Sequence, residues 1–318
     1  MDVFQQYADV HGWGQTVVAI GNFDGVHIGH QALLQAAEDM SAGGTRRVVV
    51  LTFDPHPMSV VAPHRSVQAL SSLKDRLDLL AYHGVEGTLV QTFDRAFAQL
   101  SADEFIQRVL VDALKVRGVV VGFNFGFGSG RSGNVETLRD AGRRMGFELG
   151  VVDAVSDAKT DAVSSSRIRQ AVASGSLSQA SEFLGRPHWL TGLVVPGEQR
   201  GRTLGFPTAN ISPEVTAYPP RGVYAGWLDT GEMLVSAVAN IGTKPTFHDA
   251  HEQTLEVHAL DTEIGDVYGR RVRFYFESQI REERTFSSRE TLVAQIGLDC
   301  DAARIALADL KPPHRFSL

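Results

Sequence analysis

The chain has 318 residues, of which 43% are hydrophobic and 21% are charged, and its formal net charge is −7. This length exceeds one ordinary hydrophobic core and favours two globular domains. The negative charge disfavours broad binding to nucleic acid, so any phosphate site must be built locally. The single cysteine, Cys300, excludes an intramolecular disulfide and fits a reducing compartment such as the cytoplasm. No signal peptide and no apolar stretch of membrane-spanning length is evident, so no membrane association is expected.

The most informative string is GNFDGVHIGH, residues 21–30. It follows an apolar run at residues 16–20 and precedes residues 31–37, which have helical spacing, so the pattern predicts a buried strand, a tight turn and a helix. A helix N-terminus offers free N–H groups and a positive dipole end to an anion. His27 and His30 share one face of the first helical turn and can donate hydrogen bonds to developing negative charge. The string predicts a phosphate site suited to attack on the α-phosphate of a nucleotide.

The residues of this string also allow other interpretations. A glycine-rich turn between a strand and a helix often only reverses the chain. Two histidines three residues apart are also a zinc-ligand spacing, although no third ligand with suitable spacing follows them.

The rest of the first half alternates between strand and helix patterns, which predicts a doubly wound parallel sheet. The expected strands cover residues 47–53, 85–92, 117–121 and 147–152, and the expected helices cover residues 73–82, 102–114 and 135–145. In such a fold, ligands gather beyond the carboxyl ends of the strands.

Three further motifs fall at such strand ends. TFDPHP (52–57) resembles a rigid turn, and VGFNFGFGSGRSG (121–133) is a flexible loop or a loop with its aromatic rings in the core. SSSRIR (164–169) places serines at the start of a helix, which is the ordinary pattern of an N-cap. Together with Arg167 and Arg169, however, the serine hydroxyls and the backbone amides also make an anion site.

The second half has shorter, alternating strands after a boundary at residues 185–187. They are expected at residues 188–195, 222–228, 233–240, 253–260 and 271–276. This series predicts an antiparallel barrel, and residues 288–310 are expected to form a terminal helix against it.

The string GRTLGFPTANI (201–211) carries the chemistry of this half. Its glycines allow a loop to close on phosphates, and Thr208 and Asn210 supply oxygen ligands suited to Mg²⁺; a simple turn is the alternative. In LEVHALD (255–261), Glu256 is the acidic residue inside the strand, where such a carboxylate often only faces solvent.

The first-half motifs, taken in order, resemble those of the nucleotidylyltransferase superfamily and, within it, of bacterial bifunctional riboflavin kinase/FAD synthetase. Phe123 departs from that pattern, because the family commonly has an acidic residue there, whereas Asn124 matches. In the second half, GRPH, GFPTAN, GVYAG (222–226), NIGTKPTF (240–247), LEVHALD and RxExxF (281–286) resemble the riboflavin kinase domain of the same family. Lys244 stands where the family usually has Asn and receives no role.

The resemblance implies roles for individual residues of these motifs. The implied catalytic residues are His27, His30, Arg167 and Glu256. Nucleotide or phosphate contacts are implied for Gly21, Asn22, Phe23, Asp24, Gly25, Gly29, Ser164, Ser165, Ser166, Arg169, Gly201 and Arg202. Flavin or nucleotide contacts are implied for Asn124, Phe125, Arg131 and Arg281, and Mg²⁺ ligation for Thr208 and Asn210.

The resulting expectation is an α/β protein with a nucleotidylyltransferase domain at residues 1–184 and a riboflavin kinase barrel at residues 185–318. The barrel would phosphorylate riboflavin to FMN with ATP, releasing ADP, and the first domain would adenylylate FMN to FAD, releasing pyrophosphate. The pattern is compatible with a homo-oligomer. The alternatives are adenylylation or cytidylylation of another acceptor, such as phosphopantetheine, and a non-enzymatic flavin-binding regulator.

Overall fold

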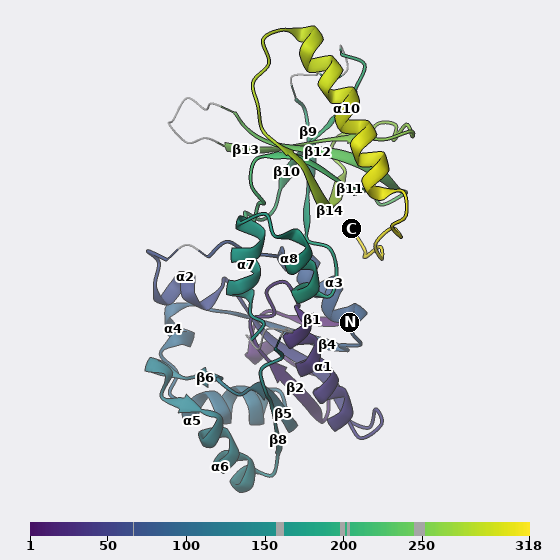
Figure 1. Cartoon of the computed structure of the whole chain (residues 1–318). Coiled ribbons are helices and arrows are strands. Elements are labelled where there is room, and N and C mark those ends of the chain that lie inside the picture. The colour runs from purple at the N-terminus through teal and green to yellow at the C-terminus, as the bar shows by residue number, and fades with distance from the viewer. Residues whose placement is uncertain (66, 157–161, 198–200, 202–203, 245–251) are drawn as a thin grey trace. The chain divides into compact units, whose positions relative to one another are not determined.

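The chain folds into two compact units, which a computed structural model describes for residues 1–65, 67–156, 162–197, 201, 204–244 and 252–318 (Figure 1). The sheet unit comprises residues 1–67 and 76–164. The barrel unit comprises residues 68–75 and 165–318.

The sheet unit alternates between strands and helices along the chain. Its strands are β1 (Asp2–Phe4), β2 (Thr16–Ile20), β3 (Arg47–Asp54), β4 (Gly87–Thr92), β5 (Val116–Gly122), β6 (Gly126–Phe127), β7 (Gly133–Asn134) and β8 (Glu148–Val152). Its helices are η1 (Tyr7–Asp9), α1 (Ile28–Met40), α2 (Pro57–Val61), α3 (Leu73–Tyr82), α4 (Arg95–Ala98), α5 (Ala102–Glu104), η2 (Phe105–Ala113), η3 (Ser129–Arg131) and α6 (Val135–Met145). Of α3, residues 73–75 belong to the barrel unit.

The main sheet has the strand order β1-β4-β3-β2-β5-β8, and all neighbouring strands are parallel. Successive strands move outward from β2 in one direction as far as β4, and the chain then returns to place β5 on the other side of β2. The topological switch point therefore lies between β2 and β5, which is where ligands bind in open sheets of this kind.

Helices cover both faces of this sheet, which confirms the prediction of a doubly wound fold. Val18 and Ile20 of β2 share a buried cluster with Ile106 of η2. On the opposite face, a Cβ atom on Gly118 would lie 2.3 Å from the Met40 sulfur of α1. The helix expected over residues 102–114 is present but continues beyond α5 as the π-helical segment η2.

The barrel unit contains a closed antiparallel barrel with the strand order β10-β13-β12-β11-β14-β9, as the alternating pattern predicted. Its strands are β9 (Trp189–Val195), β10 (Ala209–Pro213), β11 (Gly222–Asp229), β12 (Leu234–Lys244), β13 (Glu252–Ala259) and β14 (Arg271–Glu282). Its helices are α7 (Ser165–Ala173), α8 (Leu177–Leu184) and the terminal helix α10 (Arg289–Leu307). Inward-facing residues such as Leu255, Val257 and Phe276 fill the barrel.

The chain passes from one compact unit to the other between residues 164 and 165. Helices α7 and α8 lie side by side in the barrel unit (Figure 1), where α8 contacts β14. Residues 68–75 also belong to this unit, and the carbonyl oxygen of Gln68 accepts a hydrogen bond from Arg169 of α7 at 2.6 Å.

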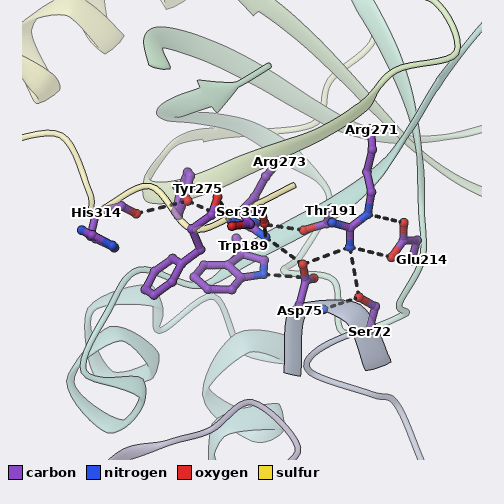
Figure 2. A network of polar contacts seen from close by, with 11 residues as sticks. Ser72, Asp75, Trp189, Thr191, Glu214, Arg271, Arg273, Tyr275, His314 and Ser317 are labelled. Atoms are coloured by element: carbon purple, nitrogen blue, oxygen red, sulfur yellow. Dashed lines mark hydrogen bonds and ion pairs between the residues drawn. The ribbon is translucent and has the colours of Figure 1, made fainter. Parts of the chain in front are cut away.

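A buried ion network holds residues 68–75 on the barrel (Figure 2). Asp75 is 1% exposed and accepts hydrogen bonds from Arg273 at 2.8 Å, Arg271 at 3.0 Å and the Trp189 indole N–H at 3.4 Å. Arg273 is fully buried and also donates to the Thr191 hydroxyl and to the carbonyl oxygens of Phe316 and Ser317. Burial alone would raise the pKa of Asp75, but the two guanidinium groups outweigh it and hold the pKa below its usual range.

We predict that Asp75→Asn destabilises the barrel unit by about 3 kcal/mol or more, because Arg273 keeps its charge in the core without a counter-ion. Urea unfolding followed by tryptophan fluorescence measures this in a Trp13→Phe background, where the remaining tryptophans, Trp189 and Trp227, belong to the barrel. Asp301→Asn, which removes an exposed ion pair with Arg304, is the matched control. Equal stability of the two variants would contradict the role given to Asp75.

A buried histidine makes the stability of the barrel unit depend on pH. His188 is 2% exposed, its Nε2–H donates to the carbonyl oxygen of Ala217 at 2.9 Å, and its ring stacks on Phe276. Burial lowers the pKa of His188 from 6.5 to about 4. Between these pH values the unfolded chain binds a proton that the folded chain does not bind, so stability falls as the pH falls.

His188→Gln should flatten this dependence, because the glutamine amide keeps a donor for Ala217 but does not titrate. The same unfolding assay, repeated between pH 6.5 and 4, should give the wild-type chain a slope steeper by up to one proton than that of the variant. Parallel slopes would show that His188 does not carry the effect.

Candidate active sites

The first site is the turn that connects β2 to α1, at the switch point of the parallel sheet. Phe23, Gly25 and Val26 have φ angles of 50°, 80° and 40°. Bulky and β-branched residues rarely adopt this left-handed conformation, and such strain is concentrated at functional sites. Phe23 and Val26 tolerate it here because both side chains are fully buried. The turn thus brings the predicted GNFDG residues to the N-terminus of α1.

The two histidines of the turn lie against each other. The two rings are stacked with centroids 3.7 Å apart, and the tilted Phe23 ring has its centroid 4.9 Å from that of His30. His27 caps α1, since its Nδ1 accepts the backbone N–H of His30 at 3.3 Å. This contact leaves Nε2–H as the donor of a neutral His27. Within the described part of the chain, no three His, Cys, Asp or Glu side chains are grouped to hold a metal ion, which does not support the zinc interpretation.

His30 is held in its neutral form. Removal from water, together with the nearby charges of His27 and Arg76, holds the pKa of His30 well below its usual range. Its Nδ1 is buried and has no hydrogen-bond partner among the described residues. A neutral imidazole with an unpaired nitrogen can hydrogen-bond a ligand at this position.

Arg76 is a buried cation of this site that the sequence analysis missed. It is 6% exposed and donates from Nη1 to the Phe53 carbonyl oxygen at 3.1 Å and the Thr52 hydroxyl at 3.4 Å. Burial lowers the pKa of this guanidinium, and the carboxylates of Asp24 and Asp54 oppose that effect. The burial of Arg76 could have been predicted from the sequence, because Arg76 lies four residues before Leu80 and therefore on the same, apolar face of α3.

The FDPHP motif is joined to the same turn. The Asp54–Pro55 peptide bond is cis, and His56 caps α2 by accepting the Met58 N–H at 3.2 Å. The other ring nitrogen of His56 lies 3.2 Å from the Asn22 side-chain amide, while the Thr52 hydroxyl donates to the Asn22 carbonyl oxygen. The ends of β2 and β3 therefore meet as predicted.

The glycine-rich segment after β5 surrounds a hollow of about 350 Å³. Three of the predicted flavin or nucleotide residues, Asn124, Phe125 and Arg131, line it together with Phe123. Arg131 donates to the Asn124 carbonyl oxygen at 3.5 Å and lies so close to Gly126 that a Cβ there would be 2.9 Å from the guanidinium. Phe127 is 7% exposed and Phe123 is 51% exposed, so one ring belongs to the core and the other reaches solvent.

The SSSRIR motif falls where the two units divide. Ser164 is the last residue of the sheet unit, and Ser165 begins α7 in the barrel unit. The Arg167 guanidinium lies over the Phe183 ring at 4.7 Å. The roles of Ser165, Ser166, Arg167 and Arg169 in anion binding stay a prediction.

The second site lies on the barrel, where β10 and β13 pair. The register places Asn210 directly opposite Glu256, and in the neighbouring ladder Glu256 is opposite Asn240. Opposed residues of antiparallel strands have Cβ atoms about 5 Å apart on one face of the sheet. Leu255 and Val257 point into the barrel, so Glu256 and Asn210 point outward together.

Two glycines let the preceding loop pack closely against these residues. A Cβ on Gly197 would lie 2.2 Å from the Asn210 amide nitrogen, and one on Gly201 would lie 2.4 Å from the Phe206 carbonyl oxygen and 3.1 Å from the Thr208 hydroxyl. Any other residue would displace the loop. Arg202, a predicted phosphate contact, lies outside the described residues.

A cavity of about 790 Å³ opens in the barrel unit where β10 begins and β13 ends. Thr208 lines it, as do His258, Ile264 and Tyr268. The volume is within the range of sites for molecules of nucleotide size. Ile264, Tyr268 and His258 were not predicted, because their strand and loop carry no pattern that sets them apart from ordinary surface residues.

Arg281, predicted to contact flavin or nucleotide, is fixed by a carboxylate of the terminal helix. Its Nε and Nη2 donate to Asp299 at 2.9 and 2.8 Å, and Nη1 donates to the Glu282 carbonyl oxygen. Gln295 also donates to Asp299, at 2.6 Å. The contact of Arg281 with a ligand stays a prediction, and Asp299 sets its orientation.

Two protein families match the chain, one over each half, and each half contains one of the two sites described above. A family described as FAD synthetase matches residues 10–167, and a family described as riboflavin kinase matches residues 184–307. The bifunctional riboflavin kinase/FMN adenylyltransferase of Escherichia coli K12 is 40% identical over 297 residues, covering 93% of this chain and 94% of that protein. The protein of the same name from Pseudomonas fluorescens is 37% identical, covering 92% and 93%.

A solved structure with the same architecture carries a different title. The Streptococcus pneumoniae chain described as a macrolide-efflux protein superimposes with a TM-score of 0.86 at 32% identity, covering 95% of this chain and 98% of that one. Among the residues described for this chain, no helix is both long and apolar enough to cross a bilayer.

Proposed function

The chain belongs to the family of bifunctional riboflavin kinase/FMN adenylyltransferases, and we propose that each of its two units carries one of the two active sites. The barrel unit is assigned the phosphorylation of riboflavin by ATP, which yields FMN and ADP. The sheet unit is assigned the adenylylation of FMN by a second ATP, which yields FAD and pyrophosphate.

The observation that carries the kinase assignment is the pairing of Glu256 with Asn210 beside the cavity that Thr208 lines. A carboxylate at this position can accept the proton of the riboflavin 5′-hydroxyl as its oxygen attacks the γ-phosphorus of ATP. Phosphoryl transfer needs positioning and charge neutralisation rather than a covalent intermediate. We assign the cavity to the nucleotide because of its size and its position next to Thr208.

Thr208 and Asn210 are suited to hold Mg²⁺. Both supply uncharged oxygen ligands, Glu256 faces Asn210 across the ladder, and Gly197 and Gly201 let the loop approach Asn210 and Thr208 closely. A bound Mg²⁺ would neutralise charge on the β- and γ-phosphates. The protein's own contribution is to hold these side chains on one face of two paired strands.

The adenylylation site is assigned to the stacked histidines and the N-terminus of α1. The phosphate of FMN is already an anionic nucleophile, so its oxygen can attack the α-phosphorus of ATP without a strong base while the bond to pyrophosphate breaks. His27, His30 and the first amides of α1 would donate hydrogen bonds to the charge that develops. Arg76 of the same unit is proposed to support this anion, and for Ser165 and Arg167 an anion-binding role is proposed from the resemblance of the SSSRIR motif.

The hollow around the glycine-rich segment is proposed to receive the flavin or the nucleobase. Phe125 and the exposed Phe123 offer aromatic faces, and Asn124 and Arg131 offer polar contacts. Arg281, oriented by Asp299, is proposed to contact flavin in the kinase site. Because both reactions consume ATP and Cys300 is unpaired, we place the enzyme in the cytoplasm.

The two alternatives account for fewer of these features. Transfer to another acceptor, such as phosphopantetheine, gives no use to a barrel with Thr208, Asn210 and Glu256. A flavin-binding regulator without turnover would not require the histidine pair at a helix N-terminus. Assay of the purified chain with riboflavin and MgATP separates them, since FMN and then FAD should form.

We predict that His30→Ala reduces conversion of FMN to FAD by about 10²–10³-fold, the usual effect of removing one donor aimed at developing charge. Phosphorylation of riboflavin should be nearly unchanged. Both rates are measured by chromatography of the flavins, with His11→Ala, an exposed histidine of the same unit, as the control. Equal loss of both activities would mean that the histidine pair is structural.

Glu256→Gln should lower FMN formation by about 10²–10⁴-fold, because the amide keeps the size of the side chain but cannot accept the proton. The KM for MgATP should change little, and supplied FMN should still be converted to FAD. Glu290→Gln, at an exposed position of α10, controls for the loss of one charge in this unit. A near-normal kcat would reduce Glu256 to an outward-facing strand residue without a catalytic role.

A further inference from the structure

His258 continues the face of β13 that carries Glu256, two residues further along the strand. The ladder between β10 and β13 pairs Asn210 with Glu256 and Ala209 with Val257. One step further, the same register would place Thr208 opposite His258, where the backbone pairing has ended. The two proposed Mg²⁺ ligands thus face Glu256 and His258 on the neighbouring strand.

The His258 side chain bonds to the chain just where the ladder stops. Its Nδ1 lies 2.8 Å from the carbonyl oxygen of Pro207. A carbonyl oxygen only accepts, so Nδ1 carries the proton and donates it. The distance is that of a well-formed hydrogen bond.

A second contact of the ring holds the residue before Pro207. The Phe206 ring meets the His258 ring edge to face, with centroids 5.6 Å apart and an interplanar angle of 82°. The backbone N–H of Phe206 donates to the Gly201 carbonyl oxygen at 2.9 Å. The two residues that precede Thr208 are therefore both fixed by His258.

We propose that His258 is a positioning residue of the kinase site, which holds the Phe206–Pro207 segment so that the Thr208 hydroxyl is directed at the phosphate end of the bound nucleotide. This inference rests on the proposed riboflavin kinase function of the barrel. Thr208, Pro207 and His258 line the same cavity, so a shift of Pro207 displaces Thr208 within the site. The role proposed for His258 is to hold this segment, and acceptance of the riboflavin hydroxyl proton stays assigned to Glu256.

Two substitutions separate the hydrogen bond from the ring contact. His258→Phe keeps an aromatic ring against Phe206 but removes the donor. His258→Asn loses the ring but places an amide N–H the same number of bonds from Cβ as Nδ1, so it can still donate to Pro207. His258→Gln carries its amide one bond further out and is the matched control for the asparagine variant.

The experiment is steady-state kinase assay of these full-length variants with MgATP and riboflavin varied in turn. His258→Phe and His258→Gln should raise the KM for MgATP by about tenfold, the effect of one hydrogen bond. His258→Asn should stay within about threefold of the wild type, and the KM for riboflavin should change by less than about twofold in every variant. Conversion of supplied FMN to FAD, which is assigned to the other unit, should be unaffected. Urea unfolding followed by the barrel tryptophans in the Trp13→Phe background reports whether each variant barrel is folded.

The outcomes distinguish the two levels of the proposal. Failure of the wild-type chain to form FMN would refute the riboflavin kinase function itself. An active wild type with an unchanged KM for MgATP in His258→Phe would overturn the role of the hydrogen bond. An asparagine variant as impaired as the glutamine variant would overturn it as well, since the ring would then be what matters. If the phenylalanine variant does not fold, the comparison of asparagine with glutamine decides alone.

Discussion

The register of β13 against β10 is the constraint on which the kinase half of this protein depends. It places Asn210 opposite Glu256 and at the same time turns Leu255 and Val257 into the barrel. A slip of one residue would exchange these faces, burying the carboxylate and exposing the core. The hydrophobic packing that stabilises the barrel therefore also holds Glu256 and Asn210 on one face, without a further interaction within the site. The side chain of His258 extends this control one residue beyond the ladder, to the loop that carries Thr208.

In the sheet unit, side-chain packing also holds the site residues in position, here by stabilising a turn with a strained backbone. Phe23 and Val26 are held in a left-handed conformation because their side chains are fully buried. This buried turn carries the histidine pair to the end of β2, at the switch point of the sheet. Arg76 ties the end of β3 to the same place and, with His27 and removal from water, keeps His30 neutral. A neutral His30 beside the buried Arg76 cation leaves a hydrogen-bonding group for an anion in the site.

Local patterns predicted the elements well, since helices α3 and α6 have the expected bounds. Strand β10 was missed because the FPTAN string has the proline and polar residues of a turn, and only pairing with β9 and β13 makes it a strand. The assignment of residues 68–75 to the barrel was also unpredictable, because it depends on the ion pair between Asp75 and Arg273, nearly two hundred positions apart. Glu256 and the histidines were found because motif resemblance marked them. Arg76 and His258 were missed because their importance comes from contacts between distant elements.

One chain is expected to perform two distinct ATP-dependent reactions in sequence, and isotope labelling can follow each phosphate through both. Riboflavin is incubated with the purified chain and ATP labelled in either the γ- or the α-phosphate, and the flavins are separated and counted together with ADP and pyrophosphate. We expect the γ-label to enter FMN and to persist in FAD. The α-label should enter FAD but not FMN. One ADP and one pyrophosphate should be released for each FAD formed. Tight flavin binding without label transfer, or FAD formed without ADP, would contradict this sequence of two reactions.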